Sequence, residues 1–238
     1  MRLQALIAAL SLTLGACATN PSSGPAEFAD RTGHNSFELF RPGVTVPDTL
    51  LLPVQHDQQI NSIACGAHAL ASIINYWLGE GHVSGAEILA AHPPLNLEAG
   101  YSMAELLHLA GEYGLLASAV RLPEAGIIAE LEAGRPVLVP VSVPGIFVQN
   151  WQLPGANRPL LGLPAAVTRS RTAWLSEQMG QGLVDHYVIA AGHESDSFVV
   201  MEPVWGLRTI RSSRLARYRE AFGNAAIVFS APPQLPNE

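Results

Sequence analysis

Lysine is absent from this 238-residue chain, and cysteine occurs only twice. All 13 basic residues are arginine, against 20 acidic residues, so the formal net charge is −7. Nucleic-acid binding usually needs a basic face, so this composition indicates no nucleic-acid partner. One stretch is locally basic, with Arg208, Arg211, Arg214, Arg217 and Arg219 spaced closely. We expect this run to form a solvated helix face or strand edge, with an anionic partner as the less favoured alternative.

The N-terminus lacks an apolar run long enough to cross a bilayer. Leu3 to Leu14 is mostly apolar and follows Arg2, which is typical of an export signal. Leu14-Gly15-Ala16-Cys17 comes next and resembles a bacterial lipobox, in which the peptidase cuts before a cysteine that then receives lipid. The alternative is an ordinary secretory signal with a stray cysteine. Ala18 favours the outer membrane, so we predict a cell-envelope lipoprotein that faces the periplasm.

The scarcity of cysteine gives the second thiol a particular meaning. If Cys17 carries lipid, Cys65 has no partner for a disulfide in an oxidising compartment. Such a cysteine is either fully buried or kept for its reactivity.

We predict three segments from composition. Residues 1–16 are a lipoprotein signal peptide, residues 17–48 are a flexible tether rich in Pro, Gly, Ser and Asn, and residues 49–232 are one domain. Within that domain, residues 144–182 have little periodicity and many Pro and Gly residues, and we interpret them as an insertion.

Periodicity predicts helices in the first half of the domain and strands mainly in the second half. The order favours an α+β fold rather than alternating βαβ units. The predicted helices are Cys65–Leu78, Ser84–Ala91, Ser102–Tyr113 and Ile127–Ala133, with a further helical stretch within 165–179; the predicted strands are Leu50–Val54, Ala117–Leu122, Pro136–Val143, Tyr187–Ala191, Phe198–Met201 and Ala225–Phe229.

Cys65 stands at the start of the strongest helix pattern. A thiol there meets the positive end of the helix dipole and free backbone N–H groups, which favour the thiolate. A nucleophilic cysteine needs a base, and His186 opens an apolar strand, which is unusual for packing alone. A hairpin would return Glu202 to His186, where a carboxylate can orient the imidazole. Taken singly, each of the two could also be an ordinary surface side chain.

Gln59 lies six residues before Cys65. Its side-chain amide and the backbone N–H of Cys65 can together form an oxyanion hole. His68 follows Cys65 at a spacing that metal ligands also use, but no second pair with ligand spacing lies nearby, so we predict no metal and no other cofactor.

These motifs together resemble a known family. Gln59-x5-Cys65-Gly66-x-x-Ala-Leu, a downstream His186-Tyr-Val-Ile-x-x-Gly and Glu202-Pro-x-x-Gly resemble the bacteriocin-processing, double-glycine leader peptidases, which are papain-like cysteine peptidases. The resemblance runs from about residue 55 to residue 229. It implies a papain-like fold, with Cys65 as nucleophile, His186 as base, Glu202 as the acidic member and Gln59 as oxyanion donor.

The chain departs from the family pattern in several places. The family usually has Asp where this chain has Ala64 and Glu202. Glutamate is one methylene longer, so it can serve only if the strand shifts or the side chain folds back. The insertion at 144–182 can line or cover the cleft. The family is best known at the cytoplasmic front of exporters, whereas this chain is expected to be exported, with secretion machinery as a candidate partner.

The sequence therefore predicts a lipid-anchored cysteine peptidase that cleaves an exported or periplasmic polypeptide and touches the membrane only through its lipid. One alternative is a non-catalytic, peptidase-like module that binds a secreted or surface protein. Another is a cysteine-type cell-wall amidase, for which we would expect Asp-Cys-Ser-Gly rather than Ala64-Cys65-Gly66-Ala67.

Overall fold

The computed structural model describes residues 50–59, 63–148, 168 and 171–230. The predicted signal peptide, Cys17, the tether and most of the predicted insertion lie outside these residues. Within the described residues, no helix combines the length and apolar character needed to cross a membrane.

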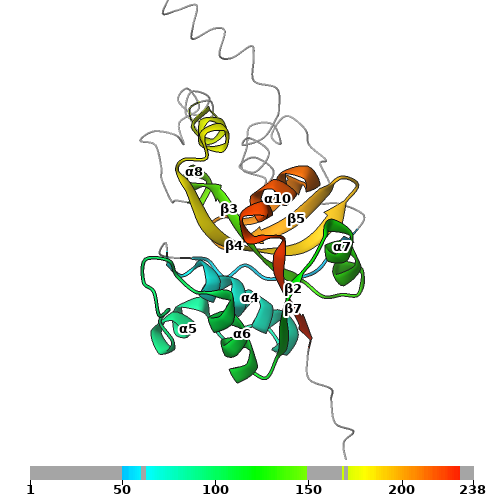
Figure 1. Cartoon of the computed structure of the whole chain (residues 1–238). Helices are drawn as coiled ribbons and strands as arrows, with labels where there is room; N and C mark the ends of the chain where they lie inside the picture. Colours follow the sequence, from blue (N-terminus) through cyan, green and yellow to red (C-terminus); the bar gives the residue numbers. More distant parts are fainter. Residues whose placement is uncertain (1–49, 60–62, 149–167, 169–170, 231–238) are drawn as a thin grey trace, which may run out of the picture.

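A seven-stranded antiparallel sheet forms the framework (Figure 1). Its main order is β2-β7-β3-β4-β5-β6, and β1 pairs with β4. Strand β4 is the longest because it pairs with β3 along its first part and with β5 along its last part. The strands are β1 (Leu50–Leu51), β2 (Leu116–Arg121), β3 (Val137–Pro144), β4 (Leu183–Glu194), β5 (Ser197–Glu202), β6 (Gly206–Arg211) and β7 (Ala225–Ser230).

Helices cover the sheet on both sides. In Figure 1, α4, α5 and α6 gather below the sheet and α10 lies above it. The helices are α4 (Cys65–Leu78), α5 (Gly85–Ala91), α6 (Met103–Glu112), α7 (Glu124–Glu132), α8 (Gly145–Val148) and α10 (Ser212–Arg219), with a 3-10 turn η1 (Glu220–Phe222); residues 171–179 are also helical. This mixture of helices and one antiparallel sheet agrees with the predicted α+β class.

Local sequence signals explain where α5 and α6 begin. Ser84 and Ser102 each accept a hydrogen bond from the backbone N–H three residues on, and the carboxylates of Glu87 and Glu105 accept the backbone N–H of the same serine. These capping boxes satisfy backbone donors that a helix start leaves unpaired. Helix α4 has no side-chain cap, because Ala64 precedes it. Its first ten residues are all buried, so packing rather than capping stabilises it.

The prediction of a solvated arginine run was right for Arg211 and Arg217, which are exposed, and wrong for the others. Arg208 lies in β6 and is only 5 % exposed, with its guanidinium over the Trp205 ring. Arg219 ends α10, is 2 % exposed and donates to the carbonyl oxygens of Leu122 and Asn224. The run is split between a strand and a helix, and much of it packs inward because its guanidinium groups find aromatic, carbonyl and carboxylate partners.

Strand β6 and helix α10 have no counterpart among the predicted elements. The basic residues hide the periodicity of α10, in which Leu215 and Tyr218 face the interior. Strand β4 extends beyond the predicted Tyr187–Ala191 at both ends, where Asp185 on one side and His193 and Glu194 on the other interrupt the apolar pattern. Strand β3 runs through Pro144, one residue into the predicted insertion.

Candidate active site

Cys65 is the first residue of α4 and is 7 % exposed. Because Ala64 supplies no side-chain cap, the backbone N–H groups at the start of α4 are not taken by a cap residue. The next residue, Gly66, faces Tyr101: a Cβ at this position would lie 2.9 Å from the Tyr101 Cβ. Gly66 therefore lets α4 pack closely against the loop that precedes α6.

His186 of β4 lies against Cys65. The two side chains form a hydrogen bond, although they are far apart in sequence. The other ring nitrogen, Nε2, lies 2.7 Å from the Glu202 Oε1 atom. Nε2 is thus occupied by the carboxylate, which leaves Nδ1 as the ring nitrogen that faces the thiol. His186 is 4 % exposed and Glu202 is completely buried, so water does not compete for these bonds.

Glu202 reaches His186 by folding back over its own turn. Its Oε1 accepts the backbone N–H of Val204 at 2.9 Å, and its Oε2 accepts that of Trp205 at 2.8 Å. The extra methylene of glutamate is therefore taken up within the turn that ends β5. The carboxylate is held by two fixed donors as well as by the imidazole, and this arrangement fixes the orientation of the ring.

The pKa of His186 is raised to about 10. Burial by itself lowers this pKa, but the hydrogen bonds and charge interactions with Cys65 and Glu202 together raise it by more. The imidazolium form of His186 is consequently favoured at neutral pH. A cationic imidazole beside a thiol is compatible with the chemistry of a cysteine nucleophile.

Gln59 is positioned by its backbone. Its N–H donates to the carbonyl oxygen of Pro203 at 2.8 Å, next to the acidic turn. Residues 60–62, which connect it to α4, lie outside the described part of the chain. The structure thus places Gln59 beside Glu202 in the fold, and its role as oxyanion donor stays a prediction.

A cavity of about 280 Å³ opens beside the thiol. One wall comes from the loop before α6 and the start of that helix, and the other comes from β3 and β4. Its lining is largely aromatic or apolar apart from Cys65, Ser102, Asp185 and His186; the other lining residues are Ala99, Tyr101, Met103, Pro140, Tyr187 and Phe222. A cleft of this kind can hold a chain segment over the nucleophile.

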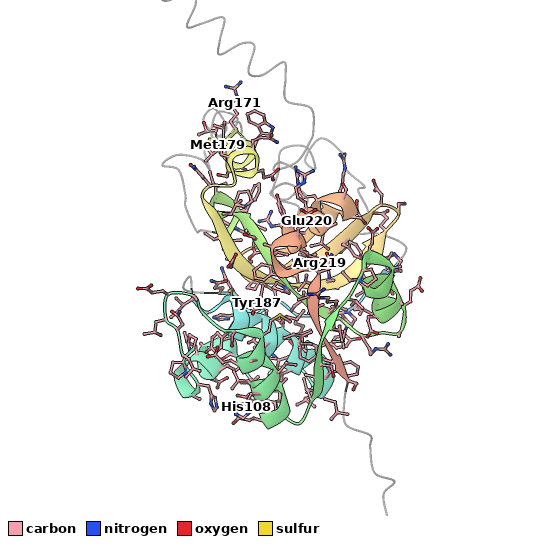
Figure 2. The ribbon with its side chains drawn as sticks, in the orientation of Figure 1. His108, Arg171, Met179, Tyr187, Arg219 and Glu220 are labelled. Carbon is pink, nitrogen blue, oxygen red and sulfur yellow. The ribbon has the colours of Figure 1, made fainter. Side chains whose placement is uncertain are left out.

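Sequence reasoning missed two polar groups around the triad. The Tyr187 hydroxyl donates to the Tyr101 carbonyl oxygen at 3.1 Å and joins the sheet to the loop before α6. Figure 2 shows Tyr187 at the junction between the sheet and the lower helices. The indole N–H of Trp205 donates to the Phe147 carbonyl oxygen at 2.6 Å. A hydroxyl inside an apolar strand was the available signal for Tyr187; nothing local indicated the partner of Trp205.

A metal site does not emerge from the described residues, where no group of three or more His, Cys, Asp and Glu side chains is arranged to hold an ion. His68, which the sequence raised as a conceivable ligand beside Cys65, instead pairs with Asp57 through Nδ1 at 3.0 Å.

Comparison with known proteins places this geometry in a familiar fold. The chain is similar to a C39-like peptidase from Bacillus anthracis, with 15% identity, a TM-score of 0.50, and coverage of 78% of this chain and 99% of the other. The peptidase domain of Streptococcus ComA gives 14% identity, a TM-score of 0.48 and coverage of 75% and 99%. A double-glycine motif protease from an AMS/PCAT transporter, solved in complex with the leader peptide, gives 14% identity and a TM-score of 0.49. The match covers 79% of this chain and 100% of the other.

No family model and no curated protein sequence matches the chain. The predicted resemblance to bacteriocin-processing, papain-like cysteine peptidases is therefore confirmed through structure neighbours and at the level of the fold. At this identity, the similarity does not establish which reaction the chain performs.

Proposed function

We propose that this chain is a papain-like cysteine peptidase that cleaves an exported or periplasmic polypeptide. The observation that carries the proposal is one imidazole held between two groups: His186 bonds to the Glu202 carboxylate through Nε2 and to the Cys65 thiol with its other side. A His–Glu pair alone is a common structural feature. A thiol at a helix start, opposite that pair and beside a cleft, is the arrangement that nucleophilic catalysis requires.

Each group has a defined task in the proposed reaction. The Cys65 thiolate attacks the carbonyl carbon of the scissile peptide bond, and the oxygen becomes an oxyanion. Backbone N–H groups at the start of α4 and the amide of Gln59 stabilise that oxyanion. His186 then gives its proton to the leaving amine, and the C–N bond breaks to leave a thioester. Water, deprotonated by His186, hydrolyses the thioester and regenerates the thiol.

The location is a separate part of the proposal. We infer from Leu14-Gly15-Ala16-Cys17 that Cys17 receives lipid and tethers the domain to the envelope. Metabolic labelling with a palmitate analogue in a bacterial host should label the chain but not its Cys17→Ser variant. Equal labelling of the two would contradict the anchor and leave the peptidase proposal standing.

The first test of the chemistry is the reaction of Cys65 with iodoacetamide as a function of pH. The full chain carrying Cys17→Ser has Cys65 as its one remaining cysteine. We expect rapid alkylation at pH 6, where a free thiol with a pKa of about 8.5 is almost fully protonated. His186→Ala should slow that reaction at least about tenfold, because the thiolate loses its imidazolium partner.

The matched control is His108→Ala, which removes an exposed histidine from α6. It should leave the alkylation rate unchanged. If Cys65 does not react at pH 6, or if His186→Ala reacts as fast as the parent, the peptidase proposal fails. A peptidase-like module that binds a secreted protein without cleaving it would then be the better explanation.

A further inference from the structure

Residues 52–59 cross the molecule between the helices and the sheet, and we call this segment the strap. At its start, the Leu52 N–H donates to the Ala191 carbonyl oxygen at 2.7 Å, which attaches the strap to the end of β4. Leu52 and Val54 are buried. The strap ends at Gln59, shortly before α4 begins at Cys65.

The last part of the strap holds the acidic turn. The His56 Nε2 atom lies 2.8 Å from the Pro203 carbonyl oxygen, and the Gln59 backbone N–H donates to the same oxygen at 2.8 Å. Pro203 stands between Glu202 and Val204, whose N–H binds the Glu202 carboxylate. Two strap residues therefore bond to one carbonyl group in the middle of the turn that positions the triad acid.

Between these two residues, Asp57 bonds in the opposite direction, to the helices. Its Oδ1 lies 3.0 Å from the His68 Nδ1 atom on α4, and its Oδ2 accepts the backbone N–H of Gly85, the first residue of α5. Its own N–H donates to the Ser72 hydroxyl at 3.3 Å. His68 is 1 % exposed, one helical turn after Cys65. Asp57 thus fixes the strap to the helix that carries the nucleophile.

The electrostatics around Asp57 favour its ionised form, which can accept the hydrogen bonds that join the strap to α4 and α5. Burial alone raises the pKa of Asp57, but its hydrogen bonds to His68 and Gly85 and the nearby His56 lower it overall. The His68 Nε2 atom is buried and has no hydrogen-bond partner among the described residues. The tautomer with its proton on Nδ1 fits this site, because a second N–H donor would be buried unpaired. The charges of Asp57 and Glu87 also interact.

We propose that His68 and Asp57 are positioning residues for the triad. They hold the strap on α4, and the strap in turn holds the Pro203 carbonyl and hence the Glu202 carboxylate against His186. Neither residue touches Cys65 or His186 in this assignment. The proposal rests on the proposed function, since it concerns the same triad. It adds that the buried His68 of α4 acts on the triad indirectly, through Asp57 and the strap.

The test needs a signal from the His186 charge rather than from folding alone. Cys65 is alkylated with iodoacetate, which is an anion, and with iodoacetamide, which is neutral. The ratio of the two rates, iodoacetate over iodoacetamide, is higher when a cationic imidazolium lies beside the thiolate, because the cation attracts the anionic reagent. In the full chain with Cys17→Ser, this ratio should fall with a midpoint at about 10, the pKa of His186. His68→Leu removes the donor to Asp57 and should move the midpoint down by about one pH unit.

Rescue by a conservative variant distinguishes positioning from bulk packing. His68→Asn keeps a donor near the place of Nδ1, so its midpoint should be closer to that of the parent than the midpoint of His68→Leu is. Ser84→Ala is the matched control, because it removes the α5 cap next to Gly85 without touching the strap. It should lower Tm by a few degrees and leave the midpoint unchanged.

His56→Phe tests the contact between the strap and the turn at Pro203. It avoids the core, because His56 is exposed. It removes the donor to Pro203 and should also lower the midpoint, even if the His68 variants fail to fold. A midpoint that stays at the parent value in His56→Phe, or in a folded His68→Leu protein, overturns the proposal. A parent chain with neither rapid alkylation at pH 6 nor any dependence of the ratio on pH overturns the proposed function instead.

Discussion

At the scale of single residues, Glu202, the proposed acidic member of the triad, is a position where this chain departs from the pattern of the peptidase family that it resembles. Glutamate fits because its carboxylate accepts two backbone N–H groups of its own turn and still reaches His186 at 2.7 Å. The longer side chain is thus a constituent of the turn, and an aspartate at the same place would have to give up one of these partners.

This arrangement makes a prediction for position 202. Glu202→Gln keeps the size of the side chain but removes its charge, and it places an NH₂ group where one backbone donor or the imidazole now binds. We expect the iodoacetate-to-iodoacetamide midpoint to fall well below about 10, the pKa of His186, and kcat/KM on any peptide substrate to fall about 10- to 100-fold.

Glu202→Asp should have a midpoint and a kcat/KM between those of the parent and Glu202→Gln, because it keeps the charge but has a shorter side chain. Glu194→Gln changes an exposed acid at the C-terminal end of β4; it is the control and should change neither quantity. Parent-like values in Glu202→Gln would mean that the carboxylate does not orient His186.

At the scale of elements, the start of α5 is fitted against α4 with no spare room. A Cβ on Gly85 would lie 2.5 Å from the His68 Cα, Cγ and Nδ1 atoms. The Gly85 N–H also binds Asp57. The first residue of α5 must therefore be glycine, and the reason is a tertiary contact rather than a turn or a left-handed backbone.

We expect Gly85→Ala to lower the free energy of unfolding by about 1–3 kcal/mol, because backbone and a buried ring must shift to admit the methyl group. Gly111→Ala is the matched control: Gly111 lies in α6 and a Cβ there would meet nothing within 4 Å. That variant should raise stability by about 0.5 kcal/mol through helix propensity. Urea unfolding of the two proteins measures both values, and equal midpoints would contradict the close contact.

The region around the predicted insertion is fixed at the end of α8 and at the helix over 171–179. Phe147, near the end of α8, accepts the indole N–H of Trp205. On the helix over 171–179, Glu177 accepts the Tyr218 hydroxyl at 2.5 Å and lies within 4 Å of Arg214 and Arg217. Two of the arginines that the sequence analysis assigned to solvent thus help to attach this helix to α10.

At the scale of the whole molecule, several carboxyl groups have a pKa below its usual value. For Asp57 and Glu105, burial raises the pKa but hydrogen bonds lower it more; for Glu130, the bond to Arg135 is the main cause. A lowered folded-state pKa stabilises the fold above the unfolded value of about 4, and this contribution is lost as the pH falls through the folded value. His186 acts in the opposite direction, since its pKa is raised to about 10. Its contribution is complete below about pH 6.5 and is lost as the pH rises through about 10.

We therefore expect maximal stability between about pH 5 and pH 6.5, with losses on both sides. Urea midpoints measured from pH 3 to pH 10.5 check this profile. Asp57→Asn should lose less stability than the parent between pH 5 and pH 3, because the group that titrates there has gone. If the acid limb of Asp57→Asn parallels that of the parent, Asp57 is not one of the carboxyl groups that titrate with unfolding.

The sequence by itself determined the features that depend on neighbours along the chain. Helix α4 has the predicted bounds because its apolar spacing and the glycine that follows are local signals. The helices predicted over 84–91 and 102–113 begin within one residue of α5 and α6, whose capping boxes are also local signals. The motifs around Cys65, His186 and Glu202 carried the resemblance to the peptidase family, because their residue types and order are those of its chemistry.

Only the tertiary structure decided how distant groups are paired. The Asp57–His68 contact, the bond from the Gln59 N–H to the Pro203 carbonyl oxygen, and the burial of Arg208 and Arg219 depend on contacts that no sequence pattern predicts. A buried polar group must find a partner, but the sequence does not name the partner, because folding brings together chain segments whose separation along the sequence is large. For this reason the sequence could name candidate reactive residues, whereas it could not name the contacts that hold them in place.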